Sequence, residues 1–128
     1  MPTRGVIIDH LTIGVSDFDR SRRFYAQALA PLGFEEVGQW SDAEHGISFG
    51  TEEADDFTIS TKYRAGGEAH IAFAADSREH VDAFHAAALG AGGRDNGAPG
   101  PRHEYSEGYY GAFVLDPDGN NVEAVFHA

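Results

Sequence analysis

The feature that most constrains the fold is an internal repeat, because the stretch from residue 10 to residue 33 recurs at residues 70–93. The two stretches align without a gap over 24 residue pairs. Six of these pairs are identical: His10/His70, Phe24/Phe84, Ala26/Ala86, Ala28/Ala88, Leu29/Leu89 and Gly33/Gly93. One supersecondary unit therefore occurs twice, and two such units must pack together to close a core.

Each copy has the pattern of a strand followed by an amphipathic helix. Apolar residues alternate over 11–15 and again over 71–73, so His10 and His70 point to the opposite face of their strands. Helices are predicted over 16–29 and 76–89, because apolar residues recur there at helical spacing. Ser16 and Asp76 begin these segments and are the predicted N-caps.

Short strands are predicted for the remainder of each copy. In the first half they cover about 34–40, 45–50 and 56–63, whereas the second half has a glycine- and proline-rich loop at 96–101 and strands near 109–116 and 121–127. The predicted fold is α+β, with two tandem βαβββ modules forming a curved, incompletely closed mixed sheet around a central cavity, helices outside. Residues 1–128 form one domain, with module 1 at about 6–64 and module 2 at about 68–127.

Three metal-ligating side chains are expected on the sheet face opposite the helices: His10, His70 and Glu123. Glu123 belongs there because Val122, Ala124 and Phe126 form the apolar face of the last strand. A buried imidazole or carboxylate must be paired or must bind something. Two histidines and one carboxylate leave open positions on a divalent ion, which suits Fe(II), Mn(II), Ni(II) or Zn(II). Aligning "TISTKY" with "NVEAVF" makes Ser60 the counterpart of Glu123.

Composition excludes several other classes of function. The formal net charge of −12 repels phosphate backbones and anionic lipids, so no nucleic acid or membrane partner is expected. The absence of cysteine excludes thiolate catalysis and zinc-thiolate sites. No signal-like stretch and no apolar run long enough for a membrane span are found, so a cytoplasmic protein is expected.

The loop "GPRHEYSEGYYGAF" at 100–113 supplies the other candidate residues. His103 is the candidate for proton transfer and Tyr105 for a catalytic hydrogen bond to the substrate. The candidates for substrate binding are Arg102, Tyr109, Tyr110 and, at a strand end in module 1, Trp40. The alternative is that this tyrosine-rich loop packs against a partner subunit.

The βαβββ duplication, the strand histidines, "DPDGN" at 116–120 and the valine-glutamate that follows resemble the vicinal oxygen chelate superfamily. This superfamily includes glyoxalase I, extradiol dioxygenases and the fosfomycin- and bleomycin-resistance proteins. The resemblance runs from about Ile8 to His127, and it implies metal ligands at His10, His70 and Glu123. "LAPLGF" and the stretch at 92–125 look like a subgroup of small bacterial glyoxalase-like proteins.

The resemblance implies a metal-dependent glyoxalase- or dioxygenase-like enzyme, a lyase, isomerase or dioxygenase, acting on a small oxygen-chelating substrate. Glyoxalase I has a glutamate at the position of Ser60, and a serine hydroxyl is neither a good ligand nor a base at neutral pH. Two alternatives are a sequestration protein of the bleomycin-resistance type, which binds a ligand without catalysis, and a purely structural metal. A homodimer is expected, and the metal site lies either within one chain or across the interface.

Overall fold

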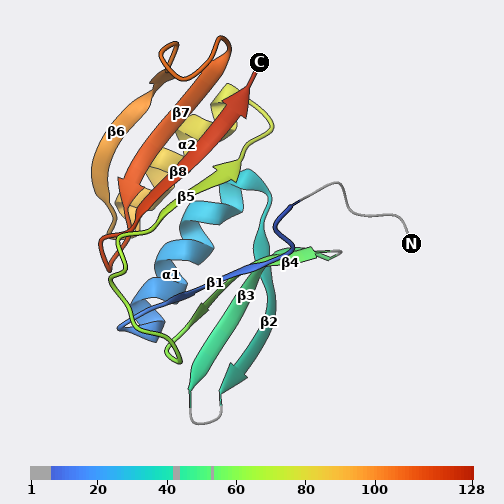
Figure 1. The fold of residues 1–128 in the computed structure, drawn as a ribbon, viewed down its shortest axis with the longest axis vertical. Coiled ribbons are helices and arrows are strands. Elements are labelled where there is room, and N and C mark those ends of the chain that lie inside the picture. The colour runs from blue at the N-terminus through green and yellow to red at the C-terminus, as the bar shows by residue number, and fades with distance from the viewer. Residues whose placement is uncertain (1–6, 42–43, 53) are drawn as a thin grey trace.

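The computed structural model describes residues 7–41, 44–52 and 54–128. Module 1 contains β1 (Leu11–Gly14), α1 (Phe18–Leu29), the 3-10 helix η1 (Ala30–Leu32), β2 (Glu35–Ser41), β3 (His45–Thr51) and β4 (Ala54–Ser60). Module 2 contains β5 (His70–Ala74), α2 (Arg78–Gly90), β6 (Arg94–Pro101), β7 (Tyr109–Leu115) and β8 (Asn121–His127), as Figure 1 shows. The predicted α+β class and the two βαβββ modules are confirmed.

The two modules have the same sheet topology. Their strands form two four-stranded mixed sheets, with orders β1-β4-β3-β2 and β5-β8-β7-β6. β1 pairs with β4 and β5 with β8 in parallel, and the other pairs are antiparallel. The histidine-bearing segments therefore run along corresponding edges of the two sheets.

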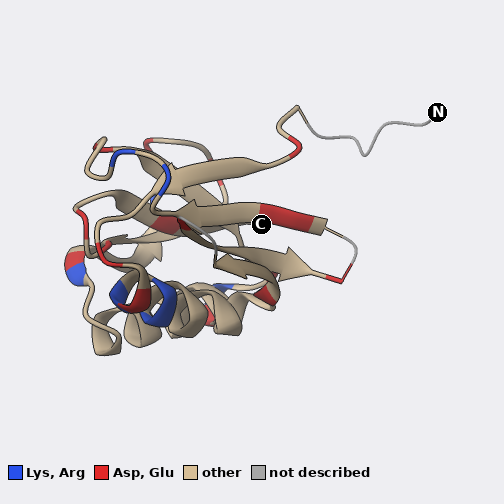
Figure 2. Ribbon diagram, turned by 90° about the horizontal axis from the view of Figure 1, so that it is seen from below, with Lys and Arg blue, Asp and Glu red and all other residues tan. Residues whose placement is uncertain are grey.

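Both helices lie on one side of the molecule and the sheets on the other (Figure 2). The helices bury matching faces, with Phe24 and Ala28 on α1 and Phe84 and Ala88 on α2 all fully buried. The sheet residues of this core include Ile59, Val114, Val122 and Ala124. Burial of each large apolar side chain stabilises the fold by about 1.5–3 kcal/mol, so the helix-covered face holds most of the stability. The opposite face is left for polar side chains.

Each helix begins one residue later than predicted. The N-cap of α1 is Asp17, whose carboxylate accepts from the Arg20 amide at 3.1 Å. The N-cap of α2 is Ser77, whose hydroxyl accepts from the His80 amide at 3.1 Å. The prediction of Ser16 was wrong because its hydroxyl donates to Asp118 of the other module instead.

The segment predicted as a loop at 96–101 is part of a strand, β6. It lies at the edge of its sheet, where Pro99 and Pro101 remove no hydrogen bond that the ladder needs. The register with β7 shifts between Asp95 and Gly97 and again between Gly97 and Gly100. These irregularities explain why the segment lacks the alternation of an ordinary strand.

A buried hydrogen-bond network joins the modules. Tyr25 on α1 donates to Asp116, the first residue of the turn between β7 and β8. The same carboxylate accepts from the backbone and side-chain amides of Asn120 at 2.8 and 3.0 Å. Burial and the neighbouring Asp116 charge raise the pKa of Tyr25 well above its ordinary value, so its hydroxyl stays protonated and donates.

Neither α1 nor α2 has the length and apolar character that a bilayer-spanning helix needs, and the same holds for every helix in the described part of the chain. Residues 1–6, which hold the predicted start of module 1 and most of the N-terminal stretch considered for targeting, lie outside the described part of the chain.

Candidate metal centre

The centre of the candidate site is a contact between His70 and Glu123. His70 is the first residue of β5, and Glu123 lies in the adjacent strand β8, directly opposite Ala72. His70 Nε2 lies 3.0 Å from Glu123 Oε1. The glutamate side chain is only 1% exposed, whereas that of His70 is 51% exposed. The pair therefore has a buried anionic end and an open imidazole end.

The hydrogen bonds of His70 determine which cation can lie between His70 and Glu123. Its Nδ1 lies 3.1 Å from the backbone oxygen of Asn121, which can only accept, so Nδ1 carries a proton. In a neutral imidazole, the lone pair of Nε2 then points at an oxygen of Glu123. Two acceptors in contact require a cation between them, either a proton or a metal ion. An imidazole nitrogen beside a carboxylate is a suitable partial ligand set for Zn(II), Fe(II), Mn(II) or Ni(II).

Tyr109 is the hydrogen-bond partner of the other oxygen of the Glu123 carboxylate. Its hydroxyl donates to Glu123 Oε2. Burial of the hydroxyl, followed by its hydrogen bond to the Glu123 carboxylate, raises the pKa of Tyr109 far above its ordinary value. The phenol is therefore protonated and can donate throughout the neutral range. The rings of Tyr105 and His127 contact the Tyr109 ring edge-on, with centroids at 5.1 and 5.2 Å.

A glycine makes room for this arrangement. A Cβ atom at Gly111 would lie 3.1 Å from Glu123 Oε2 and 3.1 Å from the Tyr109 ring. Both distances are tighter than ordinary van der Waals contact, so a side chain at 111 would push the hydrogen-bonded groups apart.

Phe113 and Arg102 extend the same face of the sheet. The His70 ring stacks on Phe113 with a centroid distance of 6.1 Å, and the Arg102 guanidinium lies 5.4 Å from the Phe113 centroid. Arg102 Nη2 donates to the backbone oxygen of Ala98 at 2.7 Å. The predicted substrate residue Arg102 thus lies in the neighbourhood of the His70–Glu123 pair, separated from His70 by an aromatic ring.

The third predicted ligand, His10, is not part of this group. It precedes β1, its side chain is 68% exposed, and its Nδ1 lies 2.9 Å from Asp9 Oδ1. The hydrogen bond and charge of Asp9 raise the pKa of His10. Among the residues that the structure describes, no three histidine, aspartate or glutamate side chains are grouped to hold a metal ion. One chain therefore supplies His70 and Glu123 together and His10 apart from them.

The counterpart of Glu123 in module 1 is Thr58, and the alignment with Ser60 was wrong. Ala72 pairs with Glu123, and the residue sixty positions before Ala72, Thr12, pairs with Thr58. The Thr58 hydroxyl lies 2.8 Å from that of Ser48, and both residues are buried. Ser60 accepts instead from the Lys62 amide at 3.0 Å. Neither position of module 1 carries a carboxylate.

Tyr110 differs from its predicted role in substrate binding. Its hydroxyl donates to Asp82 on α2 at 2.7 Å, and the Arg78 guanidinium lies 5.0 Å from its ring centroid. Tyr110 is therefore on the helix side of the sheet, opposite Glu123. Strand alternation contained this information, because Ala112 and Val114 belong to the core and residues two apart share a face.

The other predicted residues are exposed. His103 and Tyr105 lie in the loop between β6 and β7, and only Tyr105 has a described contact with the site, through Tyr109. Trp40 on β2 is 41% exposed and pairs with Gly46 of β3. Paired residues share a sheet face, so Trp40 lies on the same face as Ser60 and Gly14, which is the face of module 1 that carries Thr12.

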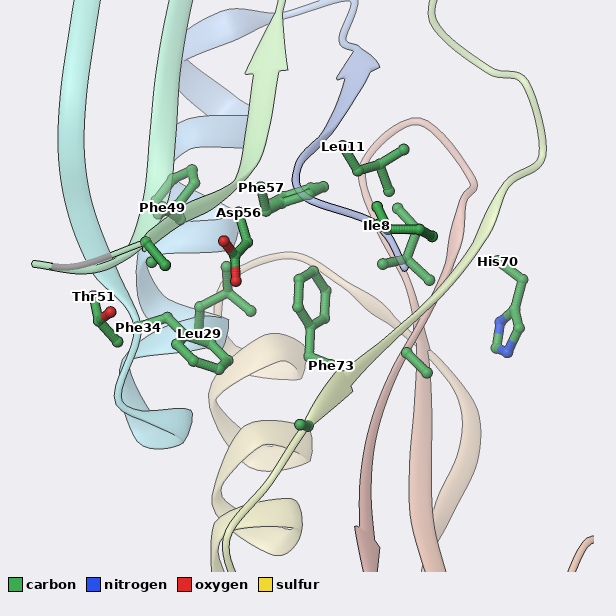
Figure 3. Close-up of a pocket in the computed structure, with 15 residues that line it drawn as sticks. Ile8, Leu11, Leu29, Phe34, Phe49, Thr51, Asp56, Phe57, His70 and Phe73 are labelled. Atoms are coloured by element: carbon green, nitrogen blue, oxygen red, sulfur yellow. The ribbon is translucent and has the colours of Figure 1, made fainter. Parts of the chain in front are cut away.

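A groove that the sequence did not predict separates the two modules. It has a volume of about 400 Å³, and its walls are largely apolar. Phe49, Phe57 and Phe73 gather inside it, whereas the imidazole of His70 points away from them at one end (Figure 3). Ile8 and Leu11 at its rim are 64% and 37% exposed. We call this the inter-module groove; its lining joins β1 and β4 to β5.

Comparison with known proteins gives concordant matches. The profile of the "Glyoxalase/Bleomycin resistance protein/Dioxygenase superfamily" matches residues 7–124. The uncharacterized protein YqjT of Bacillus subtilis (strain 168) is 32% identical over 127 residues, or 91% of this chain and 95% of that protein. A crystal structure of a glyoxalase/bleomycin resistance protein from Albidiferax ferrireducens T118 has a TM-score of 0.78 and 31% identity, over 96% of this chain and 100% of that one. Glyoxalase I from Zea mays shares the fold, with a TM-score of 0.69 and 21% identity, over 92% of this chain and 43% of that one.

Proposed function

This chain belongs to the glyoxalase/bleomycin resistance protein/dioxygenase superfamily, and on that basis we propose that it is a divalent-metal-dependent enzyme acting on a small substrate with two neighbouring oxygens. Proteins of this superfamily commonly use divalent metal ions. The single observation that carries the proposal is the contact of His70 Nε2 with Glu123 Oε1 at 3.0 Å. A buried carboxylate facing an imidazole lone pair is costly unless a cation joins them.

The chain's own residues have separable roles in this proposal. His70 and Glu123 hold the ion, which supplies Lewis acidity toward the substrate oxygens. Phe113 forms an apolar wall beside His70, and Arg102 offers a positive charge next to that wall. Tyr105 and His103 lie in the exposed loop between β6 and β7, where Tyr105 contacts Tyr109, and in this proposal they supply the hydrogen bond and the proton transfer to the substrate. Burial of Glu123 excludes water from the anionic side of the pair.

A second copy of the chain completes the ligand set with its own His10. Three observations support this part of the proposal. β1 and β5 are edge strands, and the outer edge of β1 carries only a bridge between Gly14 and Ala65 within the described residues. Apolar side chains next to that edge are exposed, namely Ile7, Ile8 and Leu11. An unpaired strand edge flanked by apolar surface is a template for pairing with another chain.

If β1 of one copy lies beside β5 of the other, His10 approaches the His70–Glu123 pair of its partner. In this dimer the face of module 1 that carries Trp40 lines the same cavity, and Trp40 is proposed to contact the substrate there. The arrangement also covers part of the inter-module groove. The active form is thus a homodimer with two equivalent sites.

The test combines metal analysis with subunit complementation. Elemental mass spectrometry of untagged protein is expected to find about one divalent metal per chain in the wild type and none in His10→Ala or His70→Ala. The two variants are then co-expressed and the mixed dimers isolated. Each mixed dimer keeps one complete site, with His10 from the His70→Ala chain and His70 and Glu123 from the His10→Ala chain.

The isolated mixed dimers are therefore expected to recover about half of the wild-type sites. Recovery of none, with metal bound by the wild type, would show that the site lies within one chain or uses other ligands. If the wild type binds none of iron, nickel, zinc or manganese when each is titrated in, the metal-dependent function is wrong and the protein is a metal-free binder.

A further inference from the structure

The second oxygen of the Glu123 carboxylate has its own dedicated donor, and this observation leads beyond the ligand set. We infer that Tyr109 is a positioning residue, which holds Glu123 so that Oε1 alone is presented to the metal beside His70. The inference rests on the proposed function, because it concerns how this same site binds its ion.

The geometry separates the two carboxylate oxygens by partner. Oε1 lies 3.0 Å from His70 Nε2, and Oε2 accepts from the Tyr109 hydroxyl. Tyr109 and Glu123 come from adjacent antiparallel strands, in which Phe113 lies opposite Glu123 and Tyr109 lies opposite His127. The phenol therefore reaches back along the sheet face to meet Glu123. A carboxylate with one oxygen held by a donor can no longer rotate freely about its last bond.

The surroundings of Tyr109 fix its ring in turn. Tyr105 and His127 pack edge-on against it, and Gly111 beneath it has no side chain to displace it. Glu123 is 1% exposed, so bulk water cannot replace the phenol hydroxyl as the partner of Oε2. A donor that is itself held by packing orients a ligand at a smaller entropic cost than a mobile side chain or water.

Presentation of a single oxygen has a consequence for chemistry. A carboxylate that binds through one oxygen occupies one coordination position, whereas one that binds through both occupies two. Because Tyr109 donates a hydrogen bond to Oε2, Glu123 takes up only one coordination position of the ion, which leaves the others for a substrate that brings two oxygens. Loss of the Tyr109 hydroxyl is expected to let the Glu123 carboxylate rotate. Both the affinity for metal and the arrangement of the ligands around the ion should then change.

The experiment compares Tyr109→Phe with Tyr110→Phe in the full-length protein. The control removes a hydroxyl from the neighbouring residue, whose partner Asp82 lies on the helix side. Co(II) affinity is measured by competition with a chromophoric chelator, and the visible absorption of the Co(II)-loaded protein is recorded at saturation. Tyr109→Phe is expected to weaken Co(II) binding about tenfold or more and to change the shape of the spectrum, while Tyr110→Phe changes neither.

The outcomes distinguish this inference from the function on which it rests. Suppose that the wild type binds Co(II), that His70→Ala abolishes this binding, and that Tyr109→Phe matches the wild type in affinity and spectrum. The proposed role of Tyr109 is then wrong, whereas the metal site stands. If the wild type binds no Co(II), both fail. Circular dichroism checks that each variant is folded. If Tyr109→Phe is unfolded, Gly111→Ala tests the same hydrogen bond, because its methyl group crowds Glu123 Oε2 while the phenol stays intact. Unchanged Co(II) affinity and an unchanged spectrum in Gly111→Ala also overturn the role of Tyr109.

Discussion

The two modules share a strand order, a histidine at the beginning of corresponding strand segments and an equivalent glycine, yet different groups fill the space over that glycine. Gly46 of β3 and Gly111 of β7 occupy equivalent positions, since they pair with Ser60 and Val125 at the same offset. In module 1 the space over Gly46 is filled by the Trp40 ring, with which a Cβ atom would overlap. In module 2 the space over Gly111 holds Glu123 Oε2 and the Tyr109 ring.

The polar groups on the sheet faces that carry these two glycines also differ between the modules. In module 1 the hydroxyls of Ser48 and Thr58 satisfy each other at 2.8 Å, and nothing further is needed. In module 2 Phe113 and Glu123 take those positions, and the Glu123 carboxylate accepts from the Tyr109 hydroxyl and contacts His70. The same scaffold thus occurs twice, and of these equivalent positions only those of module 2 carry the carboxylate that we propose as a metal ligand.

The largest expected effect comes from removing the carboxylate that distinguishes module 2. Glu123→Gln keeps the shape of the side chain but loses its charge, so metal affinity is expected to fall about a hundredfold or more. Isothermal titration with Zn(II) or Ni(II) measures this change. The matched substitution in module 1 is Thr58→Val, which leaves Ser48 without its partner and costs about 1 kcal/mol of stability.

Thr58→Val is expected to bind metal as the wild type does. The comparison between modules breaks if Thr58→Val loses metal as severely as Glu123→Gln. In that case the module 1 hydroxyl pair belongs to the site and the two copies are functionally alike.

An intermediate effect is expected from adding a methyl group at the equivalent glycines. Gly46→Ala forces the half-exposed Trp40 ring outward and costs about 1–2 kcal/mol of unfolding free energy without loosening the Glu123 carboxylate. Gly111→Ala separates Glu123 Oε2 from Tyr109, so metal affinity falls about tenfold. Urea unfolding and metal titration of both variants give the two readouts. Equal effects of the two variants on metal affinity would contradict the asymmetry.

The smallest effect concerns how each helix is attached to its sheet. In module 1 Arg22 donates to Glu36 at 2.8 and 3.0 Å, whereas the positions sixty residues later are Asp82 and Asn96. The hydrogen bond from Arg22 lowers the pKa of Glu36 below its ordinary 4.5. Because the pair is about one-third exposed, Glu36→Gln is expected to lose less than about 1 kcal/mol at neutral pH.

The sign of the pH dependence follows from the lowered pKa. The stabilisation is present above the unfolded pKa of Glu36 and is lost as pH falls through the folded one, so wild type and Glu36→Gln converge in stability only at a pH below that lowered pKa. Urea unfolding at neutral pH and at low pH measures this difference. Asn96→Ala provides the control, since its effect should not change with pH. If the difference in unfolding free energy between wild type and Glu36→Gln persists in acid, packing of the side chain rather than the ion pair causes it.

Much of the fold could be predicted because it is encoded in local periodicity. Alternation in the strands placed Glu123 opposite the core, and the repeat predicted two equal modules. Strand β6 was missed because its glycines and prolines conceal an edge strand with register shifts. The N-caps were each displaced by one residue, and at α1 the reason is that Ser16 hydrogen-bonds to Asp118, 102 residues away along the chain. Tyr110 could have been assigned correctly from alternation alone.

By itself, the sequence determined the duplication, the sheet face of residues in strands with clear alternation, such as Glu123, and the presence of two histidines and one glutamate with a ligand's chemistry. Only the tertiary structure decided that Thr58 rather than Ser60 matches Glu123, that Tyr109 holds that carboxylate, and that His10 lies apart from His70 within one chain. The reason is physical. Periodicity specifies which way a side chain points from its own backbone, whereas distances between strands depend on register and on module packing, which arise from contacts between residues far apart in the chain.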